Sequence, residues 1–96
     1  MKIQNDSTAK AIVTELRRVG AVVHYWVPAQ RQKGNPDLVV AYKGAMYLIE
    51  IKGPKTPLTE AQIKFHDEWL RMGGCVVHVC RTPEQALIVI GVEPAF

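Results

Sequence analysis

The sequence predicts one mixed α/β domain in which helices pack on a central β-sheet. The chain has 96 residues, a length that suits one hydrophobic core and is too short for two. Runs with helical spacing of apolar residues alternate with short β-branched runs, in the order α-β-β-β-α-β-α. No repeat, low-complexity segment or long linker divides the chain. We therefore expect residues 1–96 to fold as a single domain.

The N-terminal part should form a helix followed by a strand. Asp6 or Ser7 can cap a helix that ends near Val19, and Gly20 is suited to close it. Residues 21–27, AVVHYWV, are β-branched and aromatic, which favours a strand. The aromatic side chains of this run are expected to pack in the protein rather than stack on bases.

The C-terminal half should contain a helix, a strand and a short final element. The helix begins near Thr59 and ends at the glycine pair 73–74. Residues 75–80, CVVHVC, are apolar and suit a strand, which would bury both cysteines as free thiols on its opposite faces. Thr82, followed by a proline and a capping-box glutamine, favours a third helix, although LIVI in residues 87–90 is equally compatible with a strand.

Composition restricts the classes of function. Hydrophobic residues make up 48% of the chain and charged residues 22%, which is typical of a soluble globular domain. No apolar run approaches the roughly 20 residues that a membrane span needs, and the N-terminus has no secretory signal. We therefore expect a cytoplasmic protein of a bacterial or phage-infected cell, without a membrane partner. The formal charge of +3 leans mildly toward a polyanionic partner.

The charged residues of chemical interest lie in a predicted hairpin. Residues 37–42 and 46–52 suit two strands joined by a turn short enough for a hairpin. If the turn is centred on residues 44–45, Asp37 lies opposite Lys52. A register slipped by one residue would move Asp37 to the other face of the sheet.

On that register, alternation of side chains places Asp37, Glu50 and Lys52 on one face. Glu50 and Lys52 interrupt an apolar run, so they need each other or a ligand; a structural ion pair is the alternative to a functional site. Two carboxylates and the main-chain carbonyl of Ile51 are oxygen ligands of the kind that Mg²⁺ or Mn²⁺ prefers. Lys52 can orient or deprotonate a water activated by that metal. The patch therefore suits phosphodiester hydrolysis.

These residues resemble a known group of nucleases. Pro36 and Asp37, followed by Glu50 and Lys52, form the pattern of the PD-(D/E)xK superfamily. More narrowly, GNPDLVV, YLIEIKGP and LTEAQIKFHDEWLRMGGCVVHVCRTPEQA are similar to the VRR-NUC family, the virus-type replication-repair nucleases. The similarity extends from the first helix to the third.

The resemblance implies a restriction-endonuclease-like core with a metal site. In it, Asp37, Glu50 and the Ile51 carbonyl would bind Mg²⁺ or Mn²⁺, and Lys52 would serve the water. Gln62 matches the glutamine that the family carries on the helix after the Glu-x-Lys pattern. No small-molecule cofactor is expected.

Two positions leave alternatives open. The family usually supplies a further acidic ligand from the first helix, where this chain has no clear match, since Glu15 is too close to the helix end. Asn5 replaces that acid, or Asp6 reaches the metal, or the metal keeps an extra water. Gln62 either points to the site or only completes a capping box with Thr59.

Small stand-alone members of the family are similar to archaeal Holliday-junction resolvases and are expected to be homodimers. The function expected here is accordingly a metal-dependent endonuclease that cuts branched DNA such as a four-way junction. Apolar residues on both faces of the second helix, where Ile63 and Leu70 point away from Ala61, also favour a dimer. The alternatives are a non-catalytic DNA-binding module with a nuclease fold, and a monomeric flap or end-directed nuclease.

Basic side chains are the expected DNA contacts, and the histidines are not. We expect phosphates to be held by Arg31, Lys33, Lys55 and Lys10. Such contacts position DNA without reading its sequence, so recognition of branch shape is expected. His24, His66 and His78 lack the spacing of metal ligands and are expected to be packing or surface residues.

Overall fold

The structure is a computed structural model that describes residues 6–26 and 34–93. The elements follow the predicted order α-β-β-β-α-β-α, which confirms the expected α/β class. The first three residues of the segment LIVI belong to a helix and Ile90 is its C-cap, so the strand alternative for this segment is wrong. The elements are α1 (Asp6–Arg18), β1 (Val22–Tyr25), β2 (Leu38–Tyr42), β3 (Ala45–Ile51), α2 (Glu60–Arg71), β4 (Val77–Cys80) and α3 (Pro83–Val89).

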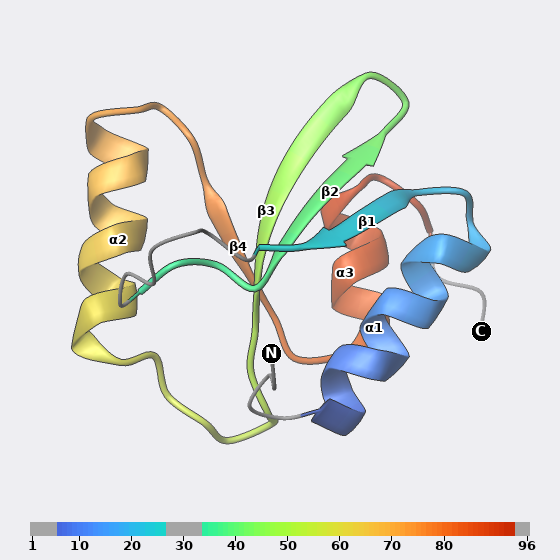
Figure 1. The fold of residues 1–96 in the computed structure, drawn as a ribbon, viewed down its shortest axis with the longest axis horizontal. Helices are drawn as coiled ribbons and strands as arrows, with labels where there is room; N and C mark the ends of the chain where they lie inside the picture. Colours follow the sequence, from blue (N-terminus) through green and yellow to red (C-terminus); the bar gives the residue numbers. More distant parts are fainter. Residues whose placement is uncertain (1–5, 27–33, 94–96) are drawn as a thin grey trace.

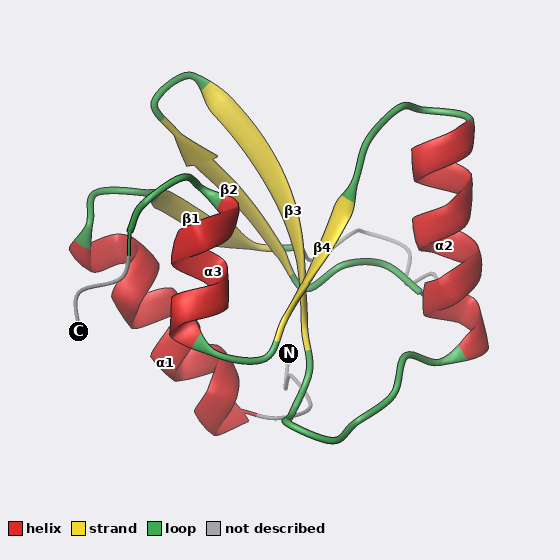
Figure 2. Ribbon diagram, turned by 180° about the vertical axis from the view of Figure 1, so that it is seen from behind, coloured by secondary structure: helices red, strands yellow, loops and turns green. Residues whose placement is uncertain are grey.

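The described strands form one mixed sheet between two layers of helix. Among the described residues the sheet has the order β1-β2-β3-β4, with antiparallel β1/β2 and β2/β3 pairs and a parallel β3/β4 pair. Helices α1 and α3 lie on one face of the sheet, and α2 lies on the other (Figures 1 and 2). The parallel pair requires a crossover, which α2 supplies. In the described part of the chain, no helix has both the length and the apolar character of a membrane span.

The hydrophobic core lies between the sheet and the α1/α3 layer. On β3, Ile49 and Ile51 are buried against this layer. Because strand side chains alternate, Glu50 between them projects from the opposite face, toward α2. Its burial at 1% exposure, beneath a helix rather than in the apolar core, is what creates the site. The largest core side chains are Ile12, Leu16, Leu38, Val40, Ile49 and Ile51.

An aromatic cluster joins helix α2 to the end of β1. Phe65 and Trp69, one turn apart on α2, stack with ring centroids 5.0 Å apart. Trp26, just after β1, meets both rings edge-on at 6.5 and 6.1 Å. Such edge-to-face pairs add roughly 0.5 to 1.5 kcal/mol each beyond their buried area. Trp26 is therefore a packing residue in this structure.

The same helix leaves apolar side chains uncovered. None of its residues, all of which are described, is buried. Ile63 and Leu70 are 53% and 52% exposed. Met72, which follows the last helical residue, is 84% exposed. A helix whose apolar residues point in several directions cannot cover them all with one small sheet.

The two cysteines differ from the expectation. The last strand begins at Val77, two residues later than the start of the apolar run, so Cys75 lies in the preceding connection and is exposed. Cys80 is buried at the end of β4, and burial raises the pKa of its thiol to about 11. Both are free thiols, but only Cys80 has the buried environment expected for the pair.

Candidate active site

The hairpin between β2 and β3 turns one residue earlier than expected. Lys43 and Gly44 occupy the turn with φ angles of 47° and 84°, and Tyr42 pairs with Ala45. Two positive φ angles are typical of the tight turn whose twist matches that of the strands it joins. The expected turn at residues 44–45 is therefore wrong.

The corrected turn changes the partner of Asp37 but not its face. Leu38 pairs with Ile49, so the preceding residue, Asp37, falls beside Glu50 rather than opposite Lys52. The displacement is two residues, from position 52 to position 50, and an even displacement keeps a side chain on the same face. The expected face shared by the two carboxylates and Lys52 is thus retained although the pairing differs.

Asp37 closes the end of the hairpin ladder with its side chain. Its main-chain N–H donates to the Ile49 carbonyl at 3.0 Å, and its Oδ2 accepts the Ile51 N–H at 2.7 Å. On the other side, the Trp26 N–H donates to the Asp37 carbonyl at 2.9 Å. The preceding Pro36 has no N–H with which to extend the ladder. Asp37 is therefore fixed between β1 and β3 at the point where regular pairing ends.

Glu50 is buried between Asp37 and α2. Gln62 Nε2 donates to its Oε2 at 3.2 Å, and His66 Nε2 lies 3.4 Å from its Oε1. Its neighbour Lys52 is 3% exposed, and the Lys52 N–H donates to the Cys80 carbonyl at 3.1 Å. The site thus brings together residues from the start of β2, the end of β3 and the first two turns of α2.

The electrostatics of the site indicate too little positive charge. Burial, followed by the hydrogen bond and the negative charge of Asp37, raises the pKa of Glu50 to about 9. The charge of Lys52 acts in the opposite direction and offsets only part of this rise. Two adjacent carboxylates in a buried place are the donor set that a divalent cation stabilises in the ionised form. The residues present therefore fit an Mg²⁺ or Mn²⁺ ion.

The first helix adds no ligand that the described residues reveal. Asn5 lies outside the described residues, as does the side chain of Asp6, with which α1 begins. Glu15 pairs instead with Arg18 on the outer surface of α1. Among the described residues there is no group of three or more His, Cys, Asp or Glu side chains able to hold a metal. The first-helix ligand stays a prediction.

Gln62 fulfils both of the roles left open by its sequence position. The Thr59 N–H donates to Gln62 Oε1 at 2.9 Å, and the Gln62 N–H donates to Thr59 Oγ1 at 3.2 Å, which completes the capping box. The amide nitrogen of the same side chain is free for Glu50. Because a glutamine amide is an acceptor at one end and a donor at the other, the two roles do not compete.

His66 and Arg81 contact the site region although the sequence analysis did not select them. Burial, together with the charge of Lys52, lowers the pKa of His66. Its position one turn after Gln62 is the signal that could have identified it. Arg81 donates from Nη1 to the carbonyls of Gly53 and Thr56, at 2.6 and 2.7 Å, and so holds the loop that leads from Lys52 to α2.

The expected DNA contacts are only partly placed. Arg31 and Lys33 lie outside the described residues. Lys55 is exposed in the loop after Lys52. Lys10 is exposed on α1, which covers the face of the sheet opposite to α2. The structure thus brings Lys55, but not Lys10, to the connection between the candidate site and α2.

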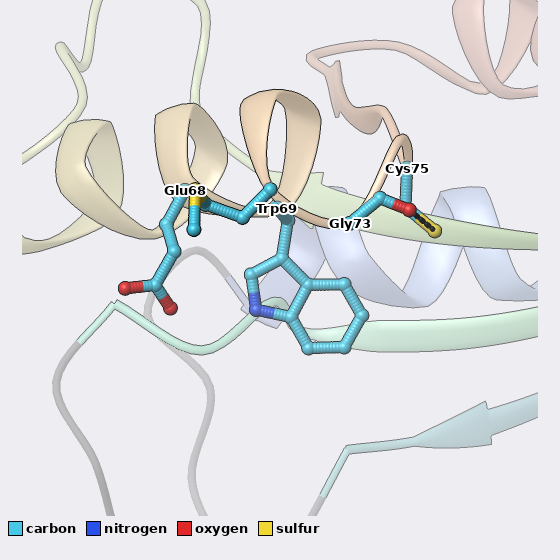
Figure 3. A pocket seen from close by; sticks show the side chains of 5 residues that line it. Glu68, Trp69, Gly73 and Cys75 are labelled. Carbon is cyan, nitrogen blue, oxygen red and sulfur yellow. Dashed lines mark hydrogen bonds between the residues drawn. The ribbon is translucent and has the colours of Figure 1, made fainter.

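A surface cavity at the far end of α2 is separate from the carboxylates. It has a volume of about 390 Å³ and is lined by Glu68, Trp69, Met72, Gly73 and Cys75. In Figure 3 the Trp69 ring lies between the Glu68 carboxylate and the Cys75 thiol, which donates to the Gly73 carbonyl at 3.5 Å. The acid and the thiol therefore do not form a pair, and we assign no chemistry to this cavity.

Comparisons with known proteins identify the family. No family model matches the chain. It is 32% identical over 76 residues to "Putative nuclease p44" of Acyrthosiphon pisum secondary endosymbiont phage 1, an alignment that covers 78% of this chain and 81% of that protein. A solved structure described as a VRR_NUC domain matches with a TM-score of 0.72 and 25% identity, over 88% of this chain and 92% of its own. The chain belongs to the VRR-NUC family.

A second solved structure supports the fold of this VRR-NUC protein. Hjc, a Holliday junction resolvase from Archaeoglobus fulgidus, matches with a TM-score of 0.60 and 18% identity. The match covers 81% of this chain and 68% of Hjc. At this identity the likeness concerns the fold alone. The VRR-NUC family and the restriction-endonuclease-like core expected from the sequence are both confirmed.

Proposed function

We propose that this VRR-NUC protein is a metal-dependent DNA endonuclease that hydrolyses phosphodiester bonds. The observation that supports it best is the meeting of Asp37 and Glu50 beside Lys52, at the start of β2 and the end of β3. Asp37, Glu50 and the Ile51 carbonyl would hold Mg²⁺ or Mn²⁺. When bound, such an ion polarises the phosphate and lowers the pKa of a coordinated water.

The side chains around the carboxylates have distinct tasks in this proposal. Lys52, nearly inaccessible at 3% exposure, orients or deprotonates the attacking water through Nζ and stabilises charge that develops on the phosphate. Gln62 holds Glu50 by its Oε2. The ordered loop after Lys52, anchored by Arg81, keeps the ammonium in register with the carboxylates.

Branched DNA is the substrate that we propose for this site. The likeness of fold to a Holliday junction resolvase supports this choice. We assign phosphate binding to basic side chains, and phosphate contacts carry no sequence information, so shape is what the protein would distinguish. We place this activity inside a bacterial or phage-infected cell, in line with the phage relative. The proposed phosphate contacts are Arg31, Lys33, Lys55 and Lys10.

A homodimer would give this activity the two active sites that a four-way junction requires. The exposed apolar side chains of α2, Ile63 and Leu70, support a second copy of the chain as the partner that covers them. Exposed apolar patches on a protein surface commonly mark interaction sites. Met72 and Val76, just beyond the helix end, are also exposed, at 84% and 51%. Each chain of a two-fold dimer would then cut one strand of the junction.

Cleavage of a panel of DNA shapes tests the proposal. Labelled four-way junction, flap and linear duplex are incubated with the protein in Mg²⁺, in Mn²⁺ and in EDTA. We expect metal-dependent cutting with the junction preferred, and loss of cutting in Lys52→Ala. Undiminished cutting by Lys52→Ala, or equal cutting in EDTA, would contradict the proposed metal-dependent mechanism. Preference for the flap by a protein that sediments as a monomer would instead select the flap or end-directed nuclease.

A non-catalytic DNA-binding module is the second candidate. It is favoured by one observation, that the described residues supply two carboxylates at the site and no third acidic ligand. Such a module would bind the junction equally well with and without metal and would cut none of the panel. Binding measured by gel shift in EDTA, alongside the cleavage panel, separates this candidate from the enzyme.

A further inference from the structure

The contacts of Glu50 point to a role for His66 that the proposed function does not include. We propose that His66 is a positioning residue that, together with Gln62, fixes the orientation of the Glu50 carboxylate for a divalent cation. This inference rests on the proposed metal site. It makes the first two turns of α2 part of the metal site although neither residue would touch the ion.

The geometry assigns one oxygen of Glu50 to each of the two residues. Gln62 and His66 are four residues apart on α2 and therefore project from the same face of the helix, one turn apart. Gln62 Nε2 is 3.2 Å from Oε2, and His66 Nε2 is 3.4 Å from Oε1. A carboxylate that is hydrogen-bonded at both oxygens cannot rotate about its terminal C–C bond, whereas one that is hydrogen-bonded at a single oxygen can.

When Glu50 is ionised, the chemistry fixes the direction of the His66 contact. An ionised carboxylate offers only acceptors, so the contact requires the proton of the ring on Nε2. A cation bound by Glu50 would require this ionised form. Each oxygen of Glu50 can accept more than one bond, so a donor from α2 leaves a lone pair for the ion. With a single ring proton, on Nε2, His66 is like Gln62 a neutral donor that adds no competing charge.

Orienting contacts of this kind have measurable effects on metal binding. Removal of a group that orients a metal ligand costs about 10- to 100-fold in metal affinity. His66 is not part of the apolar core, since its side chain is 15% exposed and the helix that carries it, α2, lies on the face of the sheet opposite to α1 and α3. A substitution there can therefore change the metal site without emptying the core.

Calorimetric titration of the whole protein with Mn²⁺ tests the proposal. The variants are His66→Phe, which keeps an aromatic ring without a donor, and His66→Gln, which restores an N–H. His78→Phe is the matched control, because His78 lies on β4 beside Tyr47 and does not contact Glu50 in the described structure. We expect His66→Phe to weaken Mn²⁺ binding by about 10- to 100-fold, with His66→Gln and His78→Phe close to wild type.

A second readout does not involve affinity. In the Mg²⁺-loaded protein, nitrogen chemical shifts of the His66 ring should report a proton on Nε2. A ring protonated on Nδ1 alone would overturn the proposal. So would an unchanged Mn²⁺ affinity in His66→Phe. If His66→Phe also melts at a lower temperature, the Mn²⁺ affinity of His66→Gln is the deciding measurement. Failure of the glutamine amide to restore that affinity would contradict an orienting hydrogen bond.

Asp37→Asn separates failure of this inference from failure of the proposed function. If wild type binds Mn²⁺ and Asp37→Asn does not, the metal site stands, and an unaffected His66→Phe refutes only the role of His66. If wild type and Asp37→Asn show the same absence of binding, the proposed metal site is refuted and the role of His66 with it.

Discussion

The carboxylate of Asp37 accepts the main-chain N–H of Ile51 at 2.7 Å, across the two strands that carry the candidate site. This bond stands where the regular ladder of β2 and β3 has ended, after the Leu38 and Ile49 pair. A single side chain thus both completes strand pairing and offers a charged oxygen beside Glu50. Its structural and chemical contributions can be separated by substitution.

Asp37→Asn should retain the fold and lose metal-dependent cleavage of DNA. The asparagine carbonyl can still accept the Ile51 N–H, so we expect a melting temperature close to that of wild type, whereas the loss of negative charge removes a metal ligand. Asp37→Ala removes the acceptor as well and leaves a partly buried N–H unpaired, which costs about 1 to 3 kcal/mol. The measurements are thermal melting and cleavage of a junction in Mg²⁺. Full activity of Asp37→Asn would contradict the assignment of this carboxylate.

The free energy of unfolding should fall with rising pH when no divalent cation is present. Burial and Asp37 raise the pKa of Glu50 from 4.5 to about 9. Between these two pH values the folded chain retains a proton that the unfolded chain has released. The contribution of Glu50 to the free energy of unfolding is therefore fully present below pH 4.5 and is lost as pH rises through 9. One such group gives a slope of at most about 1.4 kcal/mol per pH unit. Urea unfolding in EDTA at several pH values measures it.

Glu50→Gln is the control for this pH dependence. The amide keeps the size of the side chain and does not titrate, so we expect the slope to flatten and the stability at pH 8 to rise above that of wild type. Added Mg²⁺ should stabilise wild type more at pH 8 than at pH 5, because binding requires the ionised carboxylate. Equal slopes for the two proteins would show that Glu50 does not carry the raised pKa.

Local pattern was sufficient to predict the element order and the face of the site. Alternation along β3 places Ile49 and Ile51 in the core and Glu50 opposite, whatever the partner strand. The pairing itself was wrong because turn geometry, with positive φ at Lys43 and Gly44, depends on strand twist rather than on residue count. The partner of Asp37 is displaced by two residues, an even number, so Asp37, Glu50 and Lys52 still share one face of the sheet.

Contacts between distant segments could not be predicted in the same way. Arg81 reaches Gly53 and Thr56 across 28 and 25 residues, and no spacing in the sequence marks that bond. The spacing between the histidines does not identify His66, because the neighbour that matters is Gln62, one turn earlier on α2. Exposure of Cys75 followed from where β4 starts, and strand boundaries are the least certain part of a sequence-based assignment.

Gly34→Ala should disturb the candidate metal site indirectly, by displacing α2. Gly34 has a φ of +90°, and a methyl group there would come within 2.3 Å of the Ala61 carbonyl in the first turn of α2. Main-chain atoms cannot give way cheaply, so we expect α2 to shift and Gln62 to lose its hold on Glu50. The expected results are weaker Mn²⁺ binding and a loss of stability above the roughly 1 to 3 kcal/mol of backbone strain alone.

Gly44→Ala is the matched control for that substitution. Gly44 has a similar φ of +84°, but a methyl group there would meet nothing within 4 Å. We expect it to cost backbone strain in the hairpin turn and to leave Mn²⁺ affinity unchanged. If Gly34→Ala and Gly44→Ala behave alike in both stability and affinity, the close approach of Gly34 to α2 does not position the site.

Leu70→Glu should convert a dimer to a monomer without unfolding the chain. Leu70 is 52% exposed in the single chain, so a charge there costs little to the fold, but it would be buried opposite its counterpart in a two-fold interface through α2. We expect wild type to sediment near 21.4 kDa, which is 2 × 10.7 kDa, and Leu70→Glu near 10.7 kDa. Ile88→Glu is the control, because Ile88 is 64% exposed on α3, on the opposite side of the sheet, and its mass should match wild type. A wild-type mass of one chain would refute the dimer, and a shift caused equally by Ile88→Glu would place the interface elsewhere than on α2.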